Sequence, residues 1–187
     1  KARERSSLFV AEGVRKVEEL LHAPLAVRGA LATAALAGSP RGAALLDALA
    51  AKHVPVTEVS EAEFLSAADT ESPQGILAIA AVPSHSLEGL TLPPNARLLV
   101  LDAIQDPGNV GNLVRTAAAM GASAVVALPG TADLWNAKAV RAAAGAHFRV
   151  PALHASADAL LTFLAANHIP LWGAAADGTP MDAMKPP

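Results

Sequence analysis

The amino-acid sequence predicts an α/β protein made of two consecutive units. Apolar residues recur alternately at helical spacing and in short continuous runs, and a segment rich in proline and turn formers divides that pattern. Composition agrees, since 52% of the 187 residues are hydrophobic and 17% are charged. Such a chain can bury one substantial core or two small ones.

The first unit covers residues 1–83 and begins with a helix over residues 12–22, where apolar residues keep helical spacing until Pro24. Ser60 and Glu63 form a capping-box pattern, which predicts a second short helix from Ser60 through Ala68. The other elements expected here are a strand within residues 25–35, a helix over 41–53, a short strand over 55–59 and a buried strand over 75–82.

Residues 84–96 are predicted to be a linker, and the second unit covers residues 97–187. Strands that alternate with helices here imply parallel pairing through right-handed crossovers, with ligands bound beyond the carboxyl ends of the strands. The expected strands are residues 97–102, 122–128, 148–151 and 169–176. The expected helices are residues 112–120 ended by Gly121, 136–146 with Asn136 as N-cap, and 156–167.

Composition and charge exclude several kinds of site. The absence of cysteine excludes disulfides and thiolate metal sites, and no two of the six histidines are four residues apart, so no metal site is expected. A formal net charge of −3 argues against coating nucleic acid by bulk electrostatics, so any RNA contact must be local. No apolar run approaches the roughly 20 residues of a membrane span, and a cytoplasmic protein is expected.

The most informative stretch is residues 102–121, DAIQDPGNVGNLVRTAAAMG, where a strand delivers a Pro/Gly-rich loop onto a helix start. Backbone amides at a helix start can face an anion. Gly108 and Gly111 allow either a close approach of the backbone or a positive φ, and Asn109 offers a donor and an acceptor. Tight turns of this kind are also common as purely structural features.

Arg115 strengthens the case for a site. The sequence places its guanidinium early in a helix, at the unfavourable end of the macrodipole, which costs about 0.3 to 1 kcal/mol. Away from an apolar stripe of Leu113, Ala117 and Met120, it should project toward the loop, where a phosphate could meet it. On these physical grounds alone, a surface arginine explains it equally well.

A second basic pair lies on the next expected helix. Lys138 and Arg141 are three residues apart and share one face. The small residues 142–145 would let this helix pack closely against a neighbour. Packing therefore explains the alanines but not the arginine.

Two runs of sequence resemble a known family. DPGNVGNLVRTAAAMGA, with its D-P-x-N-x-G-x-x-x-R-T-A core, resembles the first motif of the SpoU branch of the SPOUT methyltransferases, and NAKAVRAAAGAHFRVP resembles the segment that follows it. SSLFVAEG and TESPQGILAIA are similar to sequences in the family's small ribosomal-protein-like substrate-binding domain. The resemblance implies an RNA-binding domain over residues 1–83 and a parallel-sheet SPOUT domain, an α/β knot, over residues 97–187.

The resemblance also implies methyl transfer from S-adenosylmethionine to a ribose 2′-hydroxyl of ribosomal RNA or tRNA, by a homodimer. At the matching positions Arg115 is the catalytic arginine, Asn109 the motif asparagine, and Arg141 a second arginine that holds substrate phosphate. Because arginine is normally a poor base, an orienting role for Arg115 is favoured. The RNA contacts are expected at Arg3, Arg5, Gln74 and Lys138.

The sequence departs from the family at its carboxyl end. Family members continue through a strand, a G-N-E-G-like loop and a final S-L-N-x-A-x-A helix, which tie the knot and supply most of the cofactor cage; neither motif occurs in these 187 residues. The knot segment is thus expected to be missing from this chain and present in the parent protein, and the isolated chain is expected to be inactive. The cofactor contacts expected within it are Ala174, Ala175 and Ala176.

Two other functions compete with this interpretation. A nucleotide-binding oxidoreductase would need G-x-G-x-x-G after the first strand, and the chain has only Gly108-Asn109-Val110-Gly111. A non-catalytic RNA-binding module is the stronger alternative. Because only 3% of the residues are aromatic, such a module would recognise shape and phosphates rather than stack bases.

Overall fold

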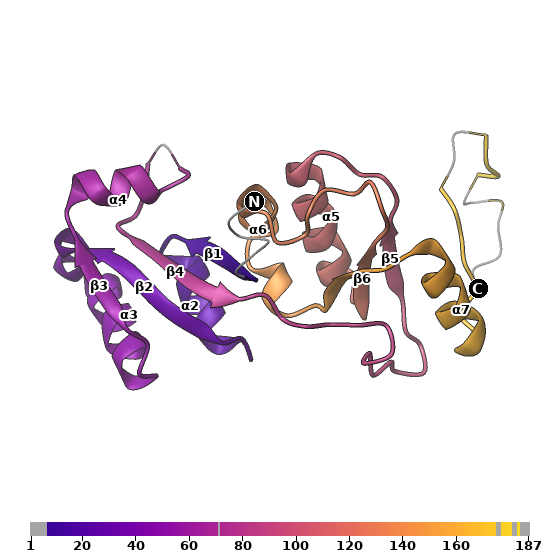
Figure 1. The fold of residues 1–187 in the computed structure, drawn as a ribbon, viewed down its shortest axis with the longest axis horizontal. Coiled ribbons are helices and arrows are strands. Elements are labelled where there is room, and N and C mark those ends of the chain that lie inside the picture. The colour runs from indigo at the N-terminus through magenta and orange to yellow at the C-terminus, as the bar shows by residue number, and fades with distance from the viewer. Residues whose placement is uncertain (1–6, 71, 175–176, 181–182, 184–187) are drawn as a thin grey trace.

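The computed structural model describes residues 7–70, 72–174, 177–180 and 183. Two β-sheets lie one after the other along the long axis of the molecule, each with its own helices (Figure 1). In the described residues no helix has both the length and the apolar character to cross a bilayer.

The first half forms a mixed four-stranded sheet in the order β1-β4-β2-β3. Only β2 and β3 are parallel, whereas β4 runs antiparallel to both β1 and β2. The elements in chain order are β1 (Leu8–Glu12), α2 (Val14–His22), β2 (Val27–Thr33), the 3-10 helix η1 (Ala34–Gly38), α3 (Pro40–Ala51), β3 (Val56–Val59), α4 (Glu61–Ala67) and β4 (Ile76–Ala81).

The predicted elements of this half are confirmed, and the capping box is present at α4. The Ser60 amide donates to Glu63 Oε2 at 2.9 Å, and the Glu63 amide donates to Ser60 Oγ at 3.3 Å. The Ser60 hydroxyl also donates to Glu63 Oε2, at 2.7 Å, and this bond and the one from the Ser60 amide hold the pKa of Glu63 below its usual range. The sequence does not predict β1, because its five residues run directly into the helical pattern that follows.

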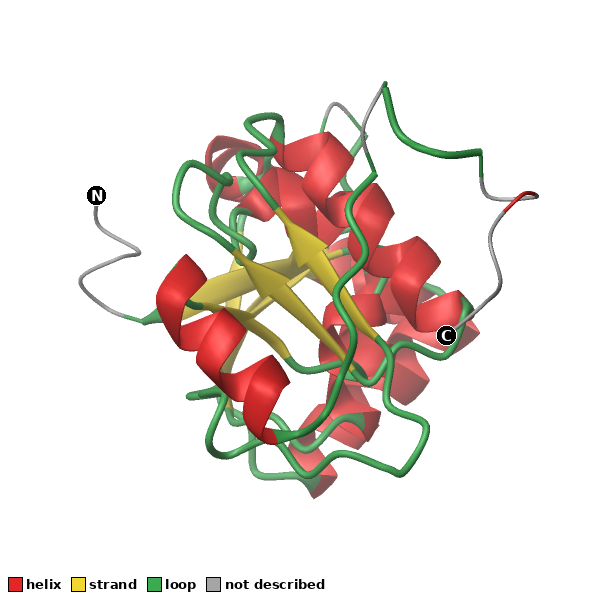
Figure 2. Ribbon diagram, turned by 90° about the vertical axis from the view of Figure 1, so that its right-hand side faces the viewer, coloured by secondary structure: helices red, strands yellow, loops and turns green. Residues whose placement is uncertain are grey.

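The second half forms a three-stranded sheet in the order β5-β6-β7, and the predicted parallel pairing of its strands is confirmed. Alternate residues of β6 face opposite ways: Val125 and Ala127 join the core beneath α5, whereas Ala124 and Val126 pack with Leu160 of α7. Helices therefore cover both faces of this sheet (Figure 2). The elements are β5 (Leu98–Leu101), α5 (Pro107–Ala119), β6 (Ala124–Ala127), α6 (Ala137–Ala142), the 3-10 helix η2 (Ala146–Phe148), β7 (Ala152–His154) and α7 (Ala157–Ala166).

The predicted start of α5 is wrong, and so is one residue of its predicted buried stripe. The helix begins at Pro107, five residues before the predicted start, because Asp106 caps it and proline suits its first position. The buried face also differs from the predicted one. Val110 and Val114 are buried with Ala117, whereas Met120, expected in the buried stripe, is 71% exposed.

Two predicted strands of the second half are also wrong. Residues 146–148 form η2 rather than the start of a strand, since Gly145 is in the left-handed region at φ 86° and turns the chain; the strand begins at Ala152, paired with Val125. The other strand was expected over residues 169–176. Its described part, residues 169–174, has no strand, and Leu171 and Trp172 are exposed there. Residues 175 and 176 lie outside the described residues.

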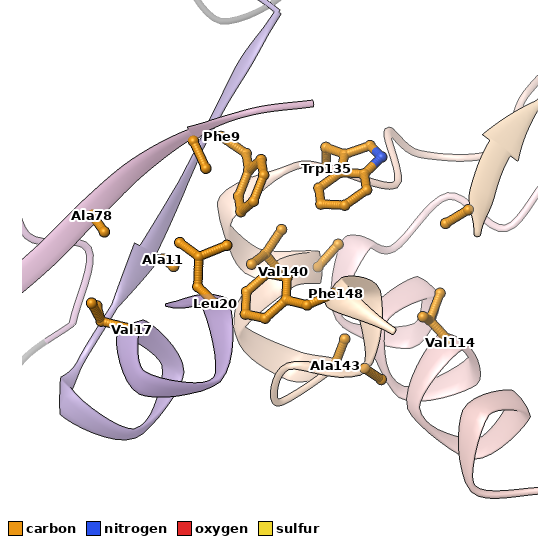
Figure 3. Close-up of a cluster of buried hydrophobic side chains, with 14 of the residues drawn as sticks. Phe9, Ala11, Val17, Leu20, Ala78, Val114, Trp135, Val140, Ala143 and Phe148 are labelled. Atoms are coloured by element: carbon orange, nitrogen blue, oxygen red, sulfur yellow. The ribbon is translucent and has the colours of Figure 1, made fainter. Parts of the chain in front are cut away.

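One apolar core joins the two halves. Phe9 of β1 lies 4.7 Å from Trp135 and 5.8 Å from Phe148, measured between ring centroids. Val140 of α6 and Leu20 of α2 extend the same cluster, in which side chains from both halves face one another (Figure 3). The predicted linker also touches a core, because Leu87 is buried in the cluster beneath α7. The two sheets are therefore held in one relative orientation by side-chain packing.

A buried histidine lies at the edge of this core. The His147 ring is 5.1 Å from that of Trp135, and neither ring nitrogen makes a hydrogen bond of normal geometry with a described residue. Burial lowers the pKa of His147 to about 4, and the backbone of Leu134 offsets only part of that shift. The imidazole is therefore neutral in the folded protein at ordinary pH.

This burial predicts an acid sensitivity that depends on one side chain. Below pH 6.5 the unfolded chain protonates His147 while the folded chain does not, so stability is complete above pH 6.5 and falls by on the order of 3 kcal/mol as the pH approaches 4. Urea unfolding across this range should show a smaller loss for His147→Leu than for the unsubstituted protein. His85→Gln, at an exposed histidine, should retain the full loss; equal pH profiles for all three proteins would contradict the assignment.

Candidate functional site

The carboxylate of Asp106 caps the turn between β5 and α5. Asp106 Oδ1 accepts the Asn109 amide at 2.9 Å, and Asp106 Oδ2 lies 2.7 Å from Lys138 Nζ. The hydrogen bond from Lys138 and the amides of the first turn hold the pKa of Asp106 below its usual range. The helix start therefore already faces an anion, supplied by the protein.

The two glycines of the motif serve close packing. Neither Gly108 nor Gly111 is among the glycines with positive φ, so a left-handed backbone conformation is excluded as the reason for glycine at these positions. A Cβ on Gly111 would lie 2.2 Å from the Ala139 carbonyl oxygen and 2.7 Å from Ala142 Cβ. Gly111 thus lets α5 and α6 approach closely, as the small residues of the second basic segment predict.

Arg115 is the ninth residue of the 13-residue helix α5, not an early one. The expected macrodipole penalty therefore does not apply, because it fades within the first turn. Its exposed side chain borders a cavity of about 400 Å³ that lies between the two halves of the protein. The residues lining this cavity are Glu12, Gly13, Arg15, Lys16, Glu19 and Gln74 from the first half, and Arg115, Ala144 and Arg149 from the second.

The cavity is basic although the protein is acidic overall. Four cationic and two anionic side chains line it, whereas the whole chain has a formal charge of −3. Focused positive charge of this kind attracts anions locally without making the whole protein a polyanion binder. The expectation that any RNA contact must be local agrees with this distribution.

Internal hydrogen bonds occupy part of the cavity lining. Glu12 accepts from the Asp69 amide at 3.0 Å and from the Thr70 hydroxyl. Lys16 Nζ donates to the Glu12 carbonyl at 2.9 Å, and burial lowers the pKa of Lys16, a shift that the Glu12 charge opposes and that of Arg141 reinforces. Gln74 Oε1 accepts the Val14 amide at 2.9 Å. Arg115, by contrast, makes no ion pair with any residue that the structure describes.

The structure brings some of the predicted site residues together and separates others. Arg115 and Gln74 line the same cavity, whereas Asn109 is exposed and is not among its lining residues. Lys138 pairs with Asp106, and Arg141 Nη1 lies 2.6 Å from Asp69 Oδ2 in the first half. The roles assigned to these residues in catalysis and RNA binding stay predictions.

The remaining predicted residues lie at the ends of the chain. Arg3, Arg5, Ala175 and Ala176 fall outside the described residues. Ala174 is exposed and borders neither the main cavity nor a smaller one of about 90 Å³ beside it. The described part of the chain therefore does not form a cage for S-adenosylmethionine around Ala174.

Of the nine residues that line the cavity, only Arg115 and Gln74 were predicted site residues, and the missed ones include Lys16, Glu19 and Arg149. Arg15 and Glu19 are four residues apart on α2, a spacing that signals an ion pair along a helix. Nothing local signals that Arg149 joins them, since it is 130 residues from Glu19 along the chain. Only the packing of the two halves brings these side chains together.

Comparison with known proteins gives matches over both halves. Residues 96–187 match the SpoU rRNA Methylase family, and residues 1–78 match the MRM3-like substrate binding domain. The chain is 32% identical over 175 residues to the 23S rRNA (guanosine(2553)-2′-O)-methyltransferase RlmP of Bacillus subtilis, covering 94% of this chain and 65% of that protein. It is 37% identical over 109 residues to the human mitochondrial rRNA methyltransferase 3, covering 55% of this chain and 26% of that protein.

Solved structures give the same result for the fold. An AdoMet-bound rRNA methyltransferase from Sinorhizobium meliloti superposes with a TM-score of 0.78 at 25% identity, covering 88% of this chain and 60% of that one. An RNA 2′-O ribose methyltransferase superposes with a TM-score of 0.73 at 31% identity, covering 90% of this chain and 63% of that one. This chain thus spans less than two thirds of each of these relatives.

The contact at Gly111 predicts a specific loss of stability. Gly111→Ala should lower the free energy of unfolding by about 1 to 3 kcal/mol, because the new methyl group meets backbone that cannot move aside cheaply. Gly38→Ala is the matched control, since a Cβ there meets nothing within 4 Å, and its effect should stay within about 0.5 kcal/mol. Chemical denaturation measures both; a Gly111→Ala protein as stable as the control would show that α5 and α6 do not meet as described.

Proposed function

This chain belongs to the SpoU rRNA methylase family, and on that premise we propose that its protein transfers a methyl group from S-adenosylmethionine to a ribose 2′-hydroxyl of ribosomal RNA. The observation that carries the proposal is the position of Arg115. This motif arginine borders a basic cavity, and six of the nine residues that line it come from the half that matches a substrate-binding domain. The relatives in B. subtilis and human, named as rRNA methyltransferases, support the substrate class.

The chemistry requires an activated hydroxyl next to an electrophilic methyl group. S-adenosylmethionine, when bound, would supply the methyl group from its sulfonium: the S–CH3 bond breaks as the new C–O bond forms, which leaves a neutral thioether, and the proton of the ribose hydroxyl is released to solvent. A guanidinium has five donors and no acceptor, so Arg115 is suited to orient the ribose oxygen and a neighbouring phosphate rather than to remove the proton. Positioning of this kind lowers the barrier by fixing the reacting groups before the reaction begins.

We also propose that the protein acts as a homodimer in the cytoplasm. Support for self-association comes from large apolar side chains that the second half leaves exposed: Met120, Leu161, Leu171 and Trp172. Exposed apolar side chains mark a protein interface where they form one contiguous patch. Sedimentation analysis of the full-length protein tests the dimer, and cell fractionation tests the location.

The catalytic role is tested by a conservative substitution. Arg115→Lys keeps the charge but loses the planar fork, so it should abolish methyl transfer while RNA affinity stays within a few fold. The measurement is incorporation of labelled methyl groups from S-adenosylmethionine into bulk ribosomal RNA by the full-length protein. Arg41→Lys is the matched control, because Arg41 is exposed, pairs with Glu18 and lies outside the cavity.

Two outcomes would contradict this proposal in different ways. Near-normal turnover by Arg115→Lys would remove Arg115 from the mechanism while leaving the family's reaction in place. Binding of ribosomal RNA without methyl incorporation by the unsubstituted protein would favour the non-catalytic RNA-binding module instead.

A further inference from the structure

Glu19 occupies an unusual position in the wall of the cavity. Its carboxylate lies 2.8 Å from Arg149 Nη2 and 3.5 Å from Arg15 Nε, so it bridges two guanidiniums. The Glu19 side chain is only 22% exposed, whereas those of Arg15 and Arg149 are 81% and 69% exposed. The Glu19 carboxylate thus faces inward, whereas the two guanidiniums that it pairs with are exposed to solvent.

The place that this carboxylate fills is shaped by the backbone. Gly145 has a φ of 86°, and a Cβ there would lie 1.9 Å from Glu19 Oε2. A side chain at position 145 would therefore displace the carboxylate as well as strain the turn. The glycine leaves room for an anionic group against the turn that precedes Arg149.

The arrangement has the chemistry of a phosphate site. Guanidiniums bind carboxylates and phosphates through the same paired hydrogen bonds. Ion pairs whose cations are this exposed contribute little stability and are screened by salt, so the carboxylate can be exchanged for another anion. Lys16 and Arg115 line the same cavity and add positive charge for a ligand that enters it.

We propose that Glu19 stands in for an RNA backbone phosphate, and that a phosphodiester of the substrate displaces its carboxylate from Arg15 and Arg149 on binding. The proposal rests on the proposed function, because it takes RNA as the ligand of the cavity. Glu19 then acts as an internal competitor, and it weakens binding of any RNA that does not place a phosphate between these two arginines.

The test compares neighbouring acids on the same helix. Glu19→Gln removes the competitor, whereas Glu18→Gln is the matched control because Glu18 pairs with Arg41 outside the cavity. Filter binding of labelled ribosomal RNA to the full-length protein, over about 50 to 200 mM salt, measures the affinity and its salt dependence. Glu19→Gln should bind roughly three- to tenfold more tightly, with little change for Glu18→Gln.

A double substitution separates competition from bulk charge. Arg149→Gln should weaken binding and reduce the slope of log K against log salt by about 0.7 to 0.9, the effect of one lost phosphate contact. In that background Glu19→Gln should change RNA affinity much less, because one of the two arginines for which carboxylate and phosphate compete is gone. If Arg149→Gln fails to fold, judged by its thermal transition, the same comparison is made in the Arg15→Gln background.

Four results would overturn the proposal. Equal tightening by Glu19→Gln and Glu18→Gln would reduce the effect to net charge, and weaker binding by Glu19→Gln would make the carboxylate a purely structural clamp. Failure of the unsubstituted protein to bind ribosomal RNA would remove the proposed function and this proposal together. Normal RNA binding that Glu19→Gln leaves unchanged would remove only this one.

Discussion

The contact of Phe9 with Trp135 and Phe148 is the packing interaction on which the site depends, because it joins the two halves of the protein. Aromatic pairs at these centroid distances contribute about 0.5 to 1.5 kcal/mol each beyond the apolar area that they bury. The cavity exists only because this packing places α2 opposite the end of α5 and the turn after α6. Neither half alone supplies both Gln74 and Arg115.

Ion pairs surround this apolar contact and have a different role. Arg141 reaches Asp69, and Arg149 reaches Glu19, each across the boundary between the halves. Exposed pairs of this kind contribute about 0 to 1 kcal/mol each, and salt weakens them further. The aromatic core therefore sets the orientation of the halves, while the ion pairs can exchange their partners without loss of the fold.

Local signals in the sequence predicted local structure well. The capping box at Ser60 and the N-caps Asn136 and Ser156 mark helix starts because each side chain bonds an amide two or three residues away. The start of α5 was missed where two signals conflict, since Asp106-Pro107 favours a helix start while two glycines nearby suggest a loop. The glycines are in the helix because α6 needs the space, which is a tertiary reason that the local pattern does not contain.

Longer-range features could be predicted less well. An apolar run such as residues 169–174 becomes a strand only if another strand pairs with it, and periodicity does not identify a partner. The candidate site has the same limit. The motif indicated Arg115, but the residues that share its cavity come from α2, from the segment before β4 and from the turn after α6.

The placement of acids explains how an acidic chain can present a basic cavity selectively. Three cations near the motifs each meet a carboxylate of the same chain: Lys138 meets Asp106, Arg141 meets Asp69 and Arg149 meets Glu19. A diffuse polyanion gains little from such paired cations, because each contact must first displace an internal carboxylate. Of these three cations only Arg149 lines the basic cavity, where a phosphate is proposed to displace Glu19, and Arg115, which makes no ion pair with a described residue, adds attraction without that penalty. Because Arg149 is already paired with Glu19, the cavity should favour a ligand whose shape places a phosphate at that arginine over polyanions in general.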